Sequence, residues 1–260
     1  MKYHSVDQGS QRWHDLRSTI PTSSKFDVLV SPAKWTIGKG EAVRNYQLEL
    51  LANRIFGLDP AAQFSSAAME HGREWEPIAR AAYEFERGVV IDDGGFFTDD
   101  AERYGASPDG LIGTEGLVEF KNPASPKVHL AALLDCTDYG SMTFETTQAI
   151  LSGGQLPGFV RDHWAQTQGQ LLVTGRHWCD LVSNFRGLPM VVVRIYPNAV
   201  YQGILQTALD TFCADLAALT EHAWQQGWYR EPEPIVMPAE DSLGITDEDL
   251  ERILAARGGK

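Results

Sequence analysis

Apolar residues recur every three or four positions in four long segments of the chain, and this spacing predicts its main helices. These segments span residues 41–56, 65–87, 160–174 and 197–228. Gly57 and Gly175 directly follow the first and third segments, as is typical of a helix end. Gly72 and Pro77 lie inside the second segment, so they are candidate breaks that would divide it into two pieces. Shorter helices are expected near residues 8–17, 125–134 and 246–257.

Short apolar runs separated by glycine-rich turns predict the strands. Residues 89–98 contain an Asp-Asp-Gly-Gly sequence between two apolar triplets, which predicts a β-hairpin. Residues 105–121 continue this sheet, and the runs at 177–185 and 190–196 predict two more strands joined by a turn at Gly187. The order of these elements indicates an α/β (α+β) fold with a central mixed β-sheet and helices on both of its faces.

One stretch, which joins a Ser-Pro-Asp-Gly turn to a Glu-Phe-Lys sequence, carries polar side chains in a pattern that catalysis can use. Asp109 lies in the turn, and Glu119 and Lys121 lie two residues apart in the next apolar run. Because side chains of a strand alternate between its faces, Glu119 and Lys121 share one face and Phe120 takes the other. If residues 113–116 form a hairpin turn, Asp109 lies beside these two side chains on the neighbouring strand.

These residue types suit a divalent cation next to a phosphate. Magnesium prefers oxygen ligands and keeps several waters. Asp109 and Glu119 supply anionic oxygens, and the backbone carbonyl of Val118 could supply a third ligand. The Lys121 ammonium could hold the attacking water or stabilise the negative charge that develops on the phosphate. This Pro-Asp, spacer, Glu-x-Lys pattern is typical of PD-(D/E)xK nucleases, although a surface hairpin with a solvated ion pair would have the same sequence.

The net charge of −13 argues against general nucleic-acid binding, because phosphate contacts need Lys and Arg. The charge is unevenly distributed: residues 1–60 contain eight Lys or Arg and six Asp or Glu, whereas residues 61–110 contain four and eleven. An acidic surface with a local basic groove would hold DNA only at that groove. A protein without a nucleic-acid partner would fit the same net charge.

Neither a membrane segment nor a disulfide framework is predicted. No apolar run approaches the roughly 18 residues that a membrane-spanning helix needs, and the N-terminus lacks the apolar core of a signal peptide. The three cysteines, Cys136, Cys179 and Cys213, are odd in number and widely spaced. This spacing favours buried thiols in a reducing compartment, so we expect a cytoplasmic protein.

Six short motifs follow one another along the chain. They are Gln8-Gly9-x-x-x-Trp13-His14-x-Leu16-Arg17, Thr22-x-Ser24, Gly72-x-x-x-Glu76-x-x-Ala79-Arg80, Ser107-Pro108-Asp109-Gly110, Glu119-x-Lys121 and Ala165-Gln166-x-Gln168. Each motif alone is unspecific, but the six in register resemble the lambda exonuclease and YqaJ-type viral recombinase family. This resemblance covers about residues 6–228 and implies a restriction-endonuclease-like PD-(D/E)xK core. We therefore expect a single nuclease domain over residues 1–230, then an acidic, proline-rich linker and a short helix over 231–260.

The resemblance implies a role for each matching residue at the predicted centre. Asp109 and Glu119, helped by the carbonyl of Val118, would bind Mg²⁺, for which Mn²⁺ can substitute. Lys121 would orient or activate the attacking water. Glu76 would lie near the metal and could hold a second ion through water. On the sequence alone, a glutamate on a helix is more often solvated, so the role of Glu76 depends on the resemblance.

The same resemblance assigns residues that handle the DNA. Gln166 would position Lys121 or the scissile phosphate. Arg17, with Ser24 beside it, would bind the 5′-phosphate at the DNA end. Ordinary roles are also open for both, since an Arg on a short helix is commonly solvated and a Ser at a helix start commonly caps it. Ser23 replaces an alanine that the family has between Thr22 and Ser24, and Asn122 replaces a cysteine that often follows the lysine.

The activity that the resemblance implies is metal-dependent 5′→3′ digestion of one strand of linear double-stranded DNA. The product would be a 3′ single-stranded tail for recombination by a single-strand annealing protein. The family works as a homotrimeric ring around DNA and is encoded by phages or prophages in bacterial hosts. Two alternatives remain open on the sequence: a PD-(D/E)xK endonuclease of restriction or repair type, and an idle binding protein that keeps the fold.

Overall fold

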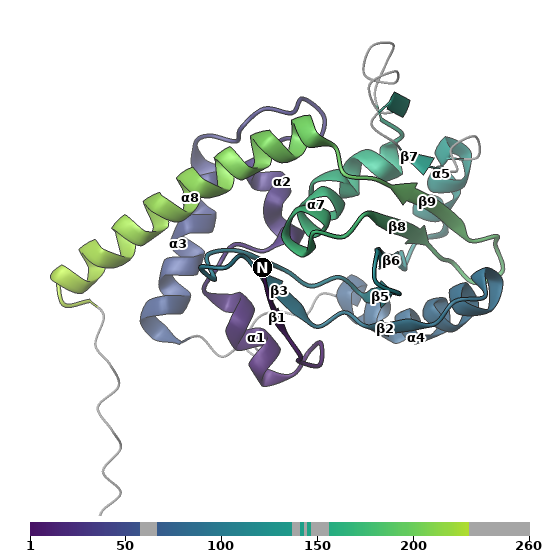
Figure 1. The fold of residues 1–260 in the computed structure, drawn as a ribbon, viewed down its shortest axis with the longest axis horizontal. Coiled ribbons are helices and arrows are strands. Elements are labelled where there is room, and N and C mark those ends of the chain that lie inside the picture. The colour runs from purple at the N-terminus through teal and green to yellow at the C-terminus, as the bar shows by residue number, and fades with distance from the viewer. Residues whose placement is uncertain (58–66, 137–140, 143–144, 147–155, 229–260) are drawn as a thin grey trace, which may run out of the picture.

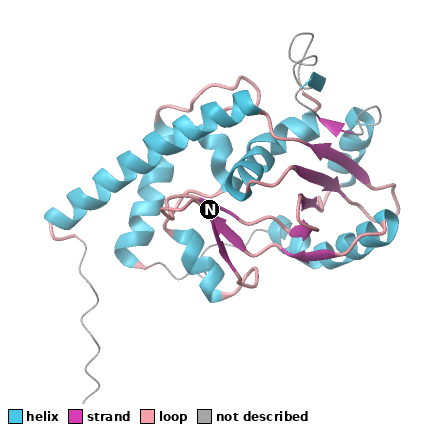
Figure 2. Ribbon diagram, in the orientation of Figure 1, coloured by secondary structure: helices cyan, strands magenta, loops and turns pink. Residues whose placement is uncertain are grey.

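The chain folds around a mixed, six-stranded β-sheet (Figures 1 and 2). The computed structural model describes residues 1–57, 67–136, 141–142, 145–146 and 156–228, so the predicted linker and helix at 231–260 lie outside it. The strand order is β2-β5-β6-β8-β9-β7. These strands are β2 (Ile91–Asp93), β5 (Gly110–Ile112), β6 (Gly116–Lys121), β7 (Ser141–Met142), β8 (Trp178–Ser183) and β9 (Val191–Ile195). Because β6 is parallel to β8 and β7 to β9, while the other neighbours are antiparallel, the predicted mixed sheet is confirmed.

Helices cover both faces of this sheet. They are α1 (Gln11–Ser18), α2 (Phe26–Leu29), α3 (Glu41–Phe56), α4 (Ala67–Arg87), α5 (Pro126–Cys136), α7 (Gly158–Thr174) and α8 (Ala199–Gln225). In Figure 1, α4 lies below the sheet, α7 lies above it, and the long α8 crosses over α3. Gly57 and Gly175 adopt the left-handed conformation at the ends of α3 and α7, so the predicted ends of these two helices are confirmed.

The prediction that Gly72 and Pro77 could break the second long helix was wrong, because α4 runs unbroken through both. Proline has no N–H, so the carbonyl of Arg73, four residues before Pro77, loses its helical donor. Both Arg73 and Pro77 are exposed to solvent, where water can take the place of that donor. The continuous helix carries Glu76 and Arg80 on consecutive turns.

The predicted hairpin over residues 89–98 was also wrong. Its first run forms β2 in the large sheet, but its second forms β3 (Phe96–Thr98) in a separate sheet of order β1-β3-β4. The other strands of that sheet are β1 (Lys2–His4) and β4 (Gly105–Ala106). A Cβ atom at Gly94 would overlap the carbonyl oxygen of Pro108. Glycine is therefore needed here because the backbone passes close to that of Pro108, and not because the chain makes a tight turn.

Strand β6 lies between two groups of buried side chains. On one face, Leu117 packs into the core that contains α7 and α8. On the other face, Val118 and Phe120 pack with Tyr83 of α4. A strand that is buried on both faces is normally apolar throughout, so the charged Glu119, only 3% exposed, is the feature of β6 that needs a functional or structural reason.

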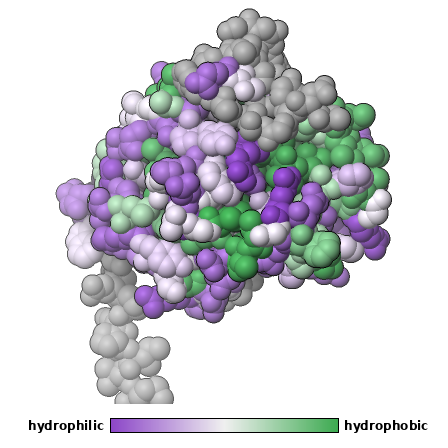
Figure 3. All heavy atoms as spheres, turned by 45° about the vertical axis from the view of Figure 1, so that its right-hand side comes forward, coloured by the Kyte–Doolittle hydropathy of each residue, from purple (hydrophilic) through white to green (hydrophobic). Residues whose placement is uncertain are grey.

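The surface is largely polar, with apolar patches between the charged side chains on the face that Figure 3 shows. Phe85 and Leu134 are 92% and 82% exposed and are among the most exposed apolar residues of the described chain. Within the described ranges, no helix combines the length and the apolar character needed to cross a membrane. The thiols of Cys136, Cys179 and Cys213 are buried and unpaired with one another, which confirms the prediction of buried thiols.

Candidate active site

The predicted hairpin between β5 and β6 is confirmed, and it brings Asp109 beside the end of β6. The two strands pair with Gly110 opposite Val118, and Gly113 adopts a positive φ of 54° in the turn between them. Asp109 directly precedes β5, and its Oδ2 accepts a hydrogen bond of 2.7 Å from the backbone N–H of Phe120. The side chain of Asp109 therefore continues the pairing of the two strands and is held at the point where the ladder ends.

Side chains of β6 alternate as the sequence predicts. Phe120 points toward α4, where its ring packs edge-on against Tyr83 with the ring centroids 5.9 Å apart. Glu119 and Lys121 point toward α7 and form an ion pair, with 2.8 Å between Lys121 Nζ and Glu119 Oε1. Glu119 and Lys121 are thus in direct contact, and Asp109 is bound to the backbone of the residue between them.

Two glutamines of α7 complete the surroundings of Glu119. Gln166 accepts a hydrogen bond of 2.9 Å from Lys121 Nζ and donates one of 2.5 Å to Glu119 Oε1. Gln170 donates a hydrogen bond of 2.6 Å to the other oxygen, Glu119 Oε2. Gln168 points elsewhere: it bonds the backbone of Tyr196 and Asn198 and fastens α7 to the start of α8.

Sequence reasoning found Gln166 but assigned no role to Gln170. The available signal was its spacing, because residues four apart lie on the same face of a helix. Gln166 and Gln170 meet this condition, whereas Gln168, which belongs to the same motif, does not. The spacing alone does not say which face of α7 meets β6.

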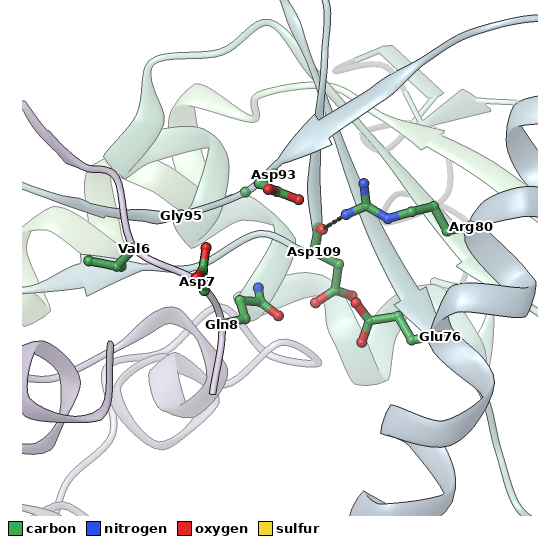
Figure 4. Close-up of a pocket in the computed structure, with 9 residues that line it drawn as sticks. Val6, Asp7, Gln8, Glu76, Arg80, Asp93, Gly95 and Asp109 are labelled. Carbon is green, nitrogen blue, oxygen red and sulfur yellow. Dashed lines mark hydrogen bonds between the residues drawn. The ribbon is translucent and has the colours of Figure 1, made fainter. Parts of the chain in front are cut away.

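Helix α4 contributes Glu76 and Arg80 on the other side of Asp109. Arg80 donates hydrogen bonds of 2.7 Å and 3.1 Å to the backbone carbonyls of Asp109 and Ile91, which fastens α4 to the ends of β5 and β2. In Figure 4 the carboxylates of Glu76 and Asp109 point toward one another. Burial and the charge of Glu119 both raise the pKa of Glu76.

The electrostatics of Asp109 and Lys121 follow from this crowding of acids. Burial, together with the charges of Glu119 and Glu76, raises the pKa of Asp109 well above its ordinary value. Burial alone would lower the pKa of Lys121, but the charges of Glu119 and Asp109 outweigh burial, so that pKa is raised and the amine stays protonated. Three carboxylates therefore crowd around one ammonium, while the guanidinium of Arg80 is directed at backbone carbonyls.

A pocket of about 260 Å³ opens beside Asp109 and Glu76 (Figure 4). Asp7 and Asp93 also line it, and Arg80 is the cationic residue in its wall. Carboxylate oxygens around a polar pocket suit a hard cation such as Mg²⁺ and repel an unaccompanied phosphate. In the described part of the chain, no group of three or more His, Cys, Asp or Glu is already arranged to hold a metal ion. The donor types fit such an ion, and their mutual repulsion gives the site a reason to bind one.

The strand register bears on which backbone carbonyl could serve as a ligand. Phe120 directs its N–H toward Asp109, so Phe120 and Val118, two residues apart, both direct their backbone groups toward β5. Val118 lies opposite Gly110, which can supply a ladder N–H. Continuing this register would place Phe120 opposite Pro108, which has no N–H to donate. The register therefore leaves the carbonyl of Phe120 more available than that of Val118, whose role stays a prediction.

The residues predicted for the 5′-phosphate lie near one another. Arg17 Nη2 donates a hydrogen bond of 3.3 Å to Ser24 Oγ, and its guanidinium lies 3.9 Å from the centre of the Trp13 ring. Trp13 in turn donates a hydrogen bond of 2.8 Å to Ser107 Oγ, next to the turn that carries Asp109. Burial lowers the pKa of Arg17 to about 10, against the opposing charges of Tyr46, Glu119 and Asp109. A guanidinium is therefore held close to the acidic cluster on the side of α1.

The chain is similar in fold to several solved structures of exonucleases. A crystal structure of the alkaline exonuclease LHK-Exo from Laribacter hongkongensis is 29% identical, with a TM-score of 0.63 over 84% of this chain and 98% of that one. A complex of LHK-Exo with dAMP matches equally well, with a TM-score of 0.64. A phage-related exonuclease from Haemophilus somnus 129PT is 12% identical over 85% of this chain and 97% of that one, with a TM-score of 0.51, and it supports the fold alone.

A search of curated proteins found no match to the chain. The match to a protein family is extensive by contrast. Residues 12–177 match the YqaJ-like viral recombinase domain, and this segment contains every one of the residues predicted for catalysis, metal binding and phosphate binding. Since the match covers more than half of the sequence, the chain belongs to the YqaJ-like viral recombinase family.

Proposed function

We propose that this protein is a metal-dependent exonuclease that digests one strand of linear double-stranded DNA from the 5′ end and leaves a 3′ single-stranded tail. The observation that carries the proposal is the convergence of Asp109, Glu119, Lys121 and Gln166 at one end of β6. The similarity to LHK-Exo supports the same reaction class, and the dAMP bound to that enzyme is the kind of nucleotide that such digestion releases.

The residues of the chain divide the work of hydrolysis. Asp109 and Glu119 would hold Mg²⁺ or Mn²⁺, together with a backbone carbonyl of β6. The resemblance assigns this third ligand to Val118, whereas the strand register favours Phe120. A bound ion makes a water molecule more acidic and polarises the phosphoryl oxygen. Glu76, next to Asp109, would hold water or a second ion at the edge of the pocket.

Lys121 is the residue that would act on the reacting atoms. Its protonated amine can hold the attacking water, or stabilise the negative charge that grows on the phosphate in the transition state. Gln166 accepts a hydrogen bond from this amine and therefore limits the directions in which it can point. Since both side chains lie between β6 and α7, the substrate phosphate would approach from the open end of this interface.

Arg17 and Ser24 would give the reaction its polarity. A guanidinium next to a hydroxyl suits a terminal phosphate, which carries more charge than a phosphodiester inside the strand. With that phosphate held on the side of α1, the first phosphodiester would lie toward Asp109. Digestion would then begin at a 5′ end and release nucleotides one after another.

The proposal extends to the assembly in which digestion takes place. A homotrimeric ring would enclose the duplex and keep the enzyme on its substrate, and a single-strand annealing protein would bind the 3′ tail. The family assignment to viral recombinases supports a phage or prophage origin and action in the cytoplasm of a bacterial host. The single nuclease domain over residues 1–230 would then be the repeating unit of the ring.

Digestion of end-labelled DNA tests the proposed reaction. Linear duplexes labelled at the 5′ or the 3′ end, with and without a 5′-phosphate, are compared with closed circular DNA in Mg²⁺ and in EDTA. We expect loss of the 5′ label first, no attack on the circle, and no activity in EDTA or with Asp109→Ala. Equal attack on circular DNA would favour the endonuclease alternative, and activity in EDTA would rule out a metal-dependent reaction.

The role of Arg17 has its own test. Arg17→Ala should slow the first cleavage of 5′-phosphorylated duplexes to the rate seen without the phosphate, and should change later cleavages less. Arg12→Ala, which removes an exposed arginine from the same helix, is the matched control. If the 5′-phosphate accelerates Arg17→Ala as much as the parent protein, this residue does not bind the phosphate.

A further inference from the structure

The two oxygens of the buried Glu119 carboxylate have different surroundings. Oε1 accepts hydrogen bonds from Lys121 and Gln166, both of which are partly exposed at the open end of the site. Oε2 has one donor among the described residues, the amide of Gln170, whose side chain is fully buried. The open side of Glu119 is therefore held by groups that substrate can reach, and the closed side by a group that substrate cannot reach.

Contacts at both ends of the Gln170 amide favour one orientation. The thiol of Cys179 lies 3.9 Å from Gln170 Oε1 and can donate a weak hydrogen bond to it. Cys179 is fully buried on β8, opposite Leu117 of β6, and burial raises the pKa of its thiol, which therefore keeps its proton. The reverse orientation of the amide would place its oxygen against the Glu119 carboxylate, which repulsion forbids.

We propose that Gln170, oriented by Cys179, is a positioning residue that fixes the Glu119 carboxylate for metal binding. This inference rests on the proposed function. The terminal torsion of a glutamate is broad, so an unrestrained carboxylate rotates easily. A charge-assisted hydrogen bond at Oε2 selects one orientation before an ion arrives, and outer residues of this kind commonly change metal affinity about 10- to 100-fold.

The test replaces Gln170 by methionine, which has a similar length and cannot donate a hydrogen bond. Binding of Mn²⁺ to the DNA-free protein, measured by calorimetry, should weaken by about 10- to 100-fold in Gln170→Met. The Mn²⁺ concentration that gives half-maximal nuclease activity should rise in parallel, and excess ion should restore much of the turnover. An ion affinity within twofold of the parent value would overturn the proposal.

Gln168→Met is the matched control for a purely structural effect. Gln168 is also fully buried, lies two residues away on the same helix, and makes hydrogen bonds of 2.8 Å and 2.9 Å, but none of them involves Glu119. We expect this variant to lower the melting temperature and to leave Mn²⁺ affinity within twofold of the parent. Equal loss of ion affinity in both variants would show that any damage to α7 has this effect, and would overturn the assigned role.

Cys179→Ala keeps the test decisive if Gln170→Met does not fold. It removes the donor that orients the amide, so Mn²⁺ affinity should fall, though less than in Gln170→Met. Its control is Cys213→Ala, since that buried thiol lies on α8 and contacts the carbonyl of Arg103 instead. Equal ion affinities in these two variants would overturn the role of Cys179.

If the parent protein itself neither binds Mn²⁺ nor digests DNA, the proposed function fails. If the parent does both and the variants match it, this inference alone fails.

Discussion

The two acids of the candidate metal site, Glu119 and Asp109, have unequal surroundings. Glu119, on the side of α7, accepts hydrogen bonds from an ammonium and two amides, so its charge is well compensated. Asp109 accepts one backbone hydrogen bond and has Glu76 beside it on the side of α4, where the guanidinium of Arg80 bonds backbone carbonyls and not a carboxylate. The pKa of Asp109 is raised by burial and by the two nearby acids. The difference indicates that the fold supplies Glu119 with several hydrogen-bond donors and leaves the carboxylates of Asp109 and Glu76 less compensated.

This asymmetry separates two tasks that a metal site must perform. The Glu119 side is rigid and already arranged, as a ligand that must not move requires. The side of Asp109 and Glu76 stores electrostatic repulsion that a cation would remove. Binding of an ion is therefore favoured by the acids that the protein stabilises least.

The largest expected effect concerns the single ammonium that both sides share. Lys121→Ala should lower kcat by about 10²- to 10³-fold, because the amine acts on charge that develops in the transition state. DNA binding should stay nearly unchanged, and Lys127→Ala, an exposed lysine on α5, is the control. Single-turnover digestion and filter binding on one linear duplex measure the two quantities. A large loss of binding with an unchanged kcat would contradict this role.

Metal ions should stabilise the folded protein through the undercompensated side. An ion present at 100 times its dissociation constant adds about 2.7 kcal/mol to the free energy of unfolding if it binds only the folded state. Thermal melts with Mg²⁺ and with EDTA measure this difference, which Asp109→Asn should abolish. Asp92→Asn, an exposed acid on β2, should keep it. Equal stabilisation of all three proteins would place the ion elsewhere.

Removal of charge should have opposite effects on the two sides in EDTA. Glu119→Gln removes the ion pair of Lys121. Since hydrogen bonds to charged groups contribute about 1.5–3 kcal/mol, we expect the free energy of unfolding to fall by about 2 kcal/mol. Folding raises the pKa of Asp109 above its ordinary value of 3.8. At a pH between the unfolded and the folded pKa, the folded state therefore binds more protons than the unfolded state. The free energy of unfolding then falls as the pH rises through this range. At neutral pH, Asp109→Asn should therefore raise the melting temperature although it abolishes activity.

Calorimetric melts at one neutral pH compare these two variants directly. Loss of stability in both would mean that Asp109 is better compensated than the surrounding charges indicate. A higher melting temperature in both variants would mean that the hydrogen bonds to Glu119 do not offset the cost of burying its charge.

The sequence predicts the residues that β5 and β6 bring together better than the helix residues that surround them. Asp109, Glu119 and Lys121 follow from local rules, because a short turn and the alternation of side chains on a strand are enough to bring them together. Glu76 was placed only by resemblance, since its approach to Asp109 depends on how α4 lies across the sheet. Gln170 was missed for the same reason: its spacing from Gln166 is visible, but the face of α7 that meets β6 is set by packing.

Backbone crossings were equally hidden from local reasoning. Gly94 and Gly95 have the composition of a hairpin turn, yet they carry the chain from one sheet into another across Pro108. The same residues line the pocket beside Asp109. A glycine pair has two uses, a tight turn and a close crossing, and sequence alone does not separate them.

The smallest expected effect concerns the attachment of α4, which holds Glu76 on the undercompensated side. Tyr83 donates a hydrogen bond of 2.5 Å to the buried Asp180, which Arg194 also holds through bonds of 2.7 Å and 2.9 Å. Because Asp180 keeps both bonds to Arg194, Tyr83→Phe should cost only about 1 kcal/mol of unfolding free energy. Urea denaturation measures this cost, and Mn²⁺ affinity measures whether Glu76 has moved. If Mn²⁺ affinity falls in Tyr83→Phe although the unfolding free energy falls by only about 1 kcal/mol, α4 needs this hydrogen bond to place Glu76. The hydrogen bonds of Arg80 would then be insufficient to hold the helix.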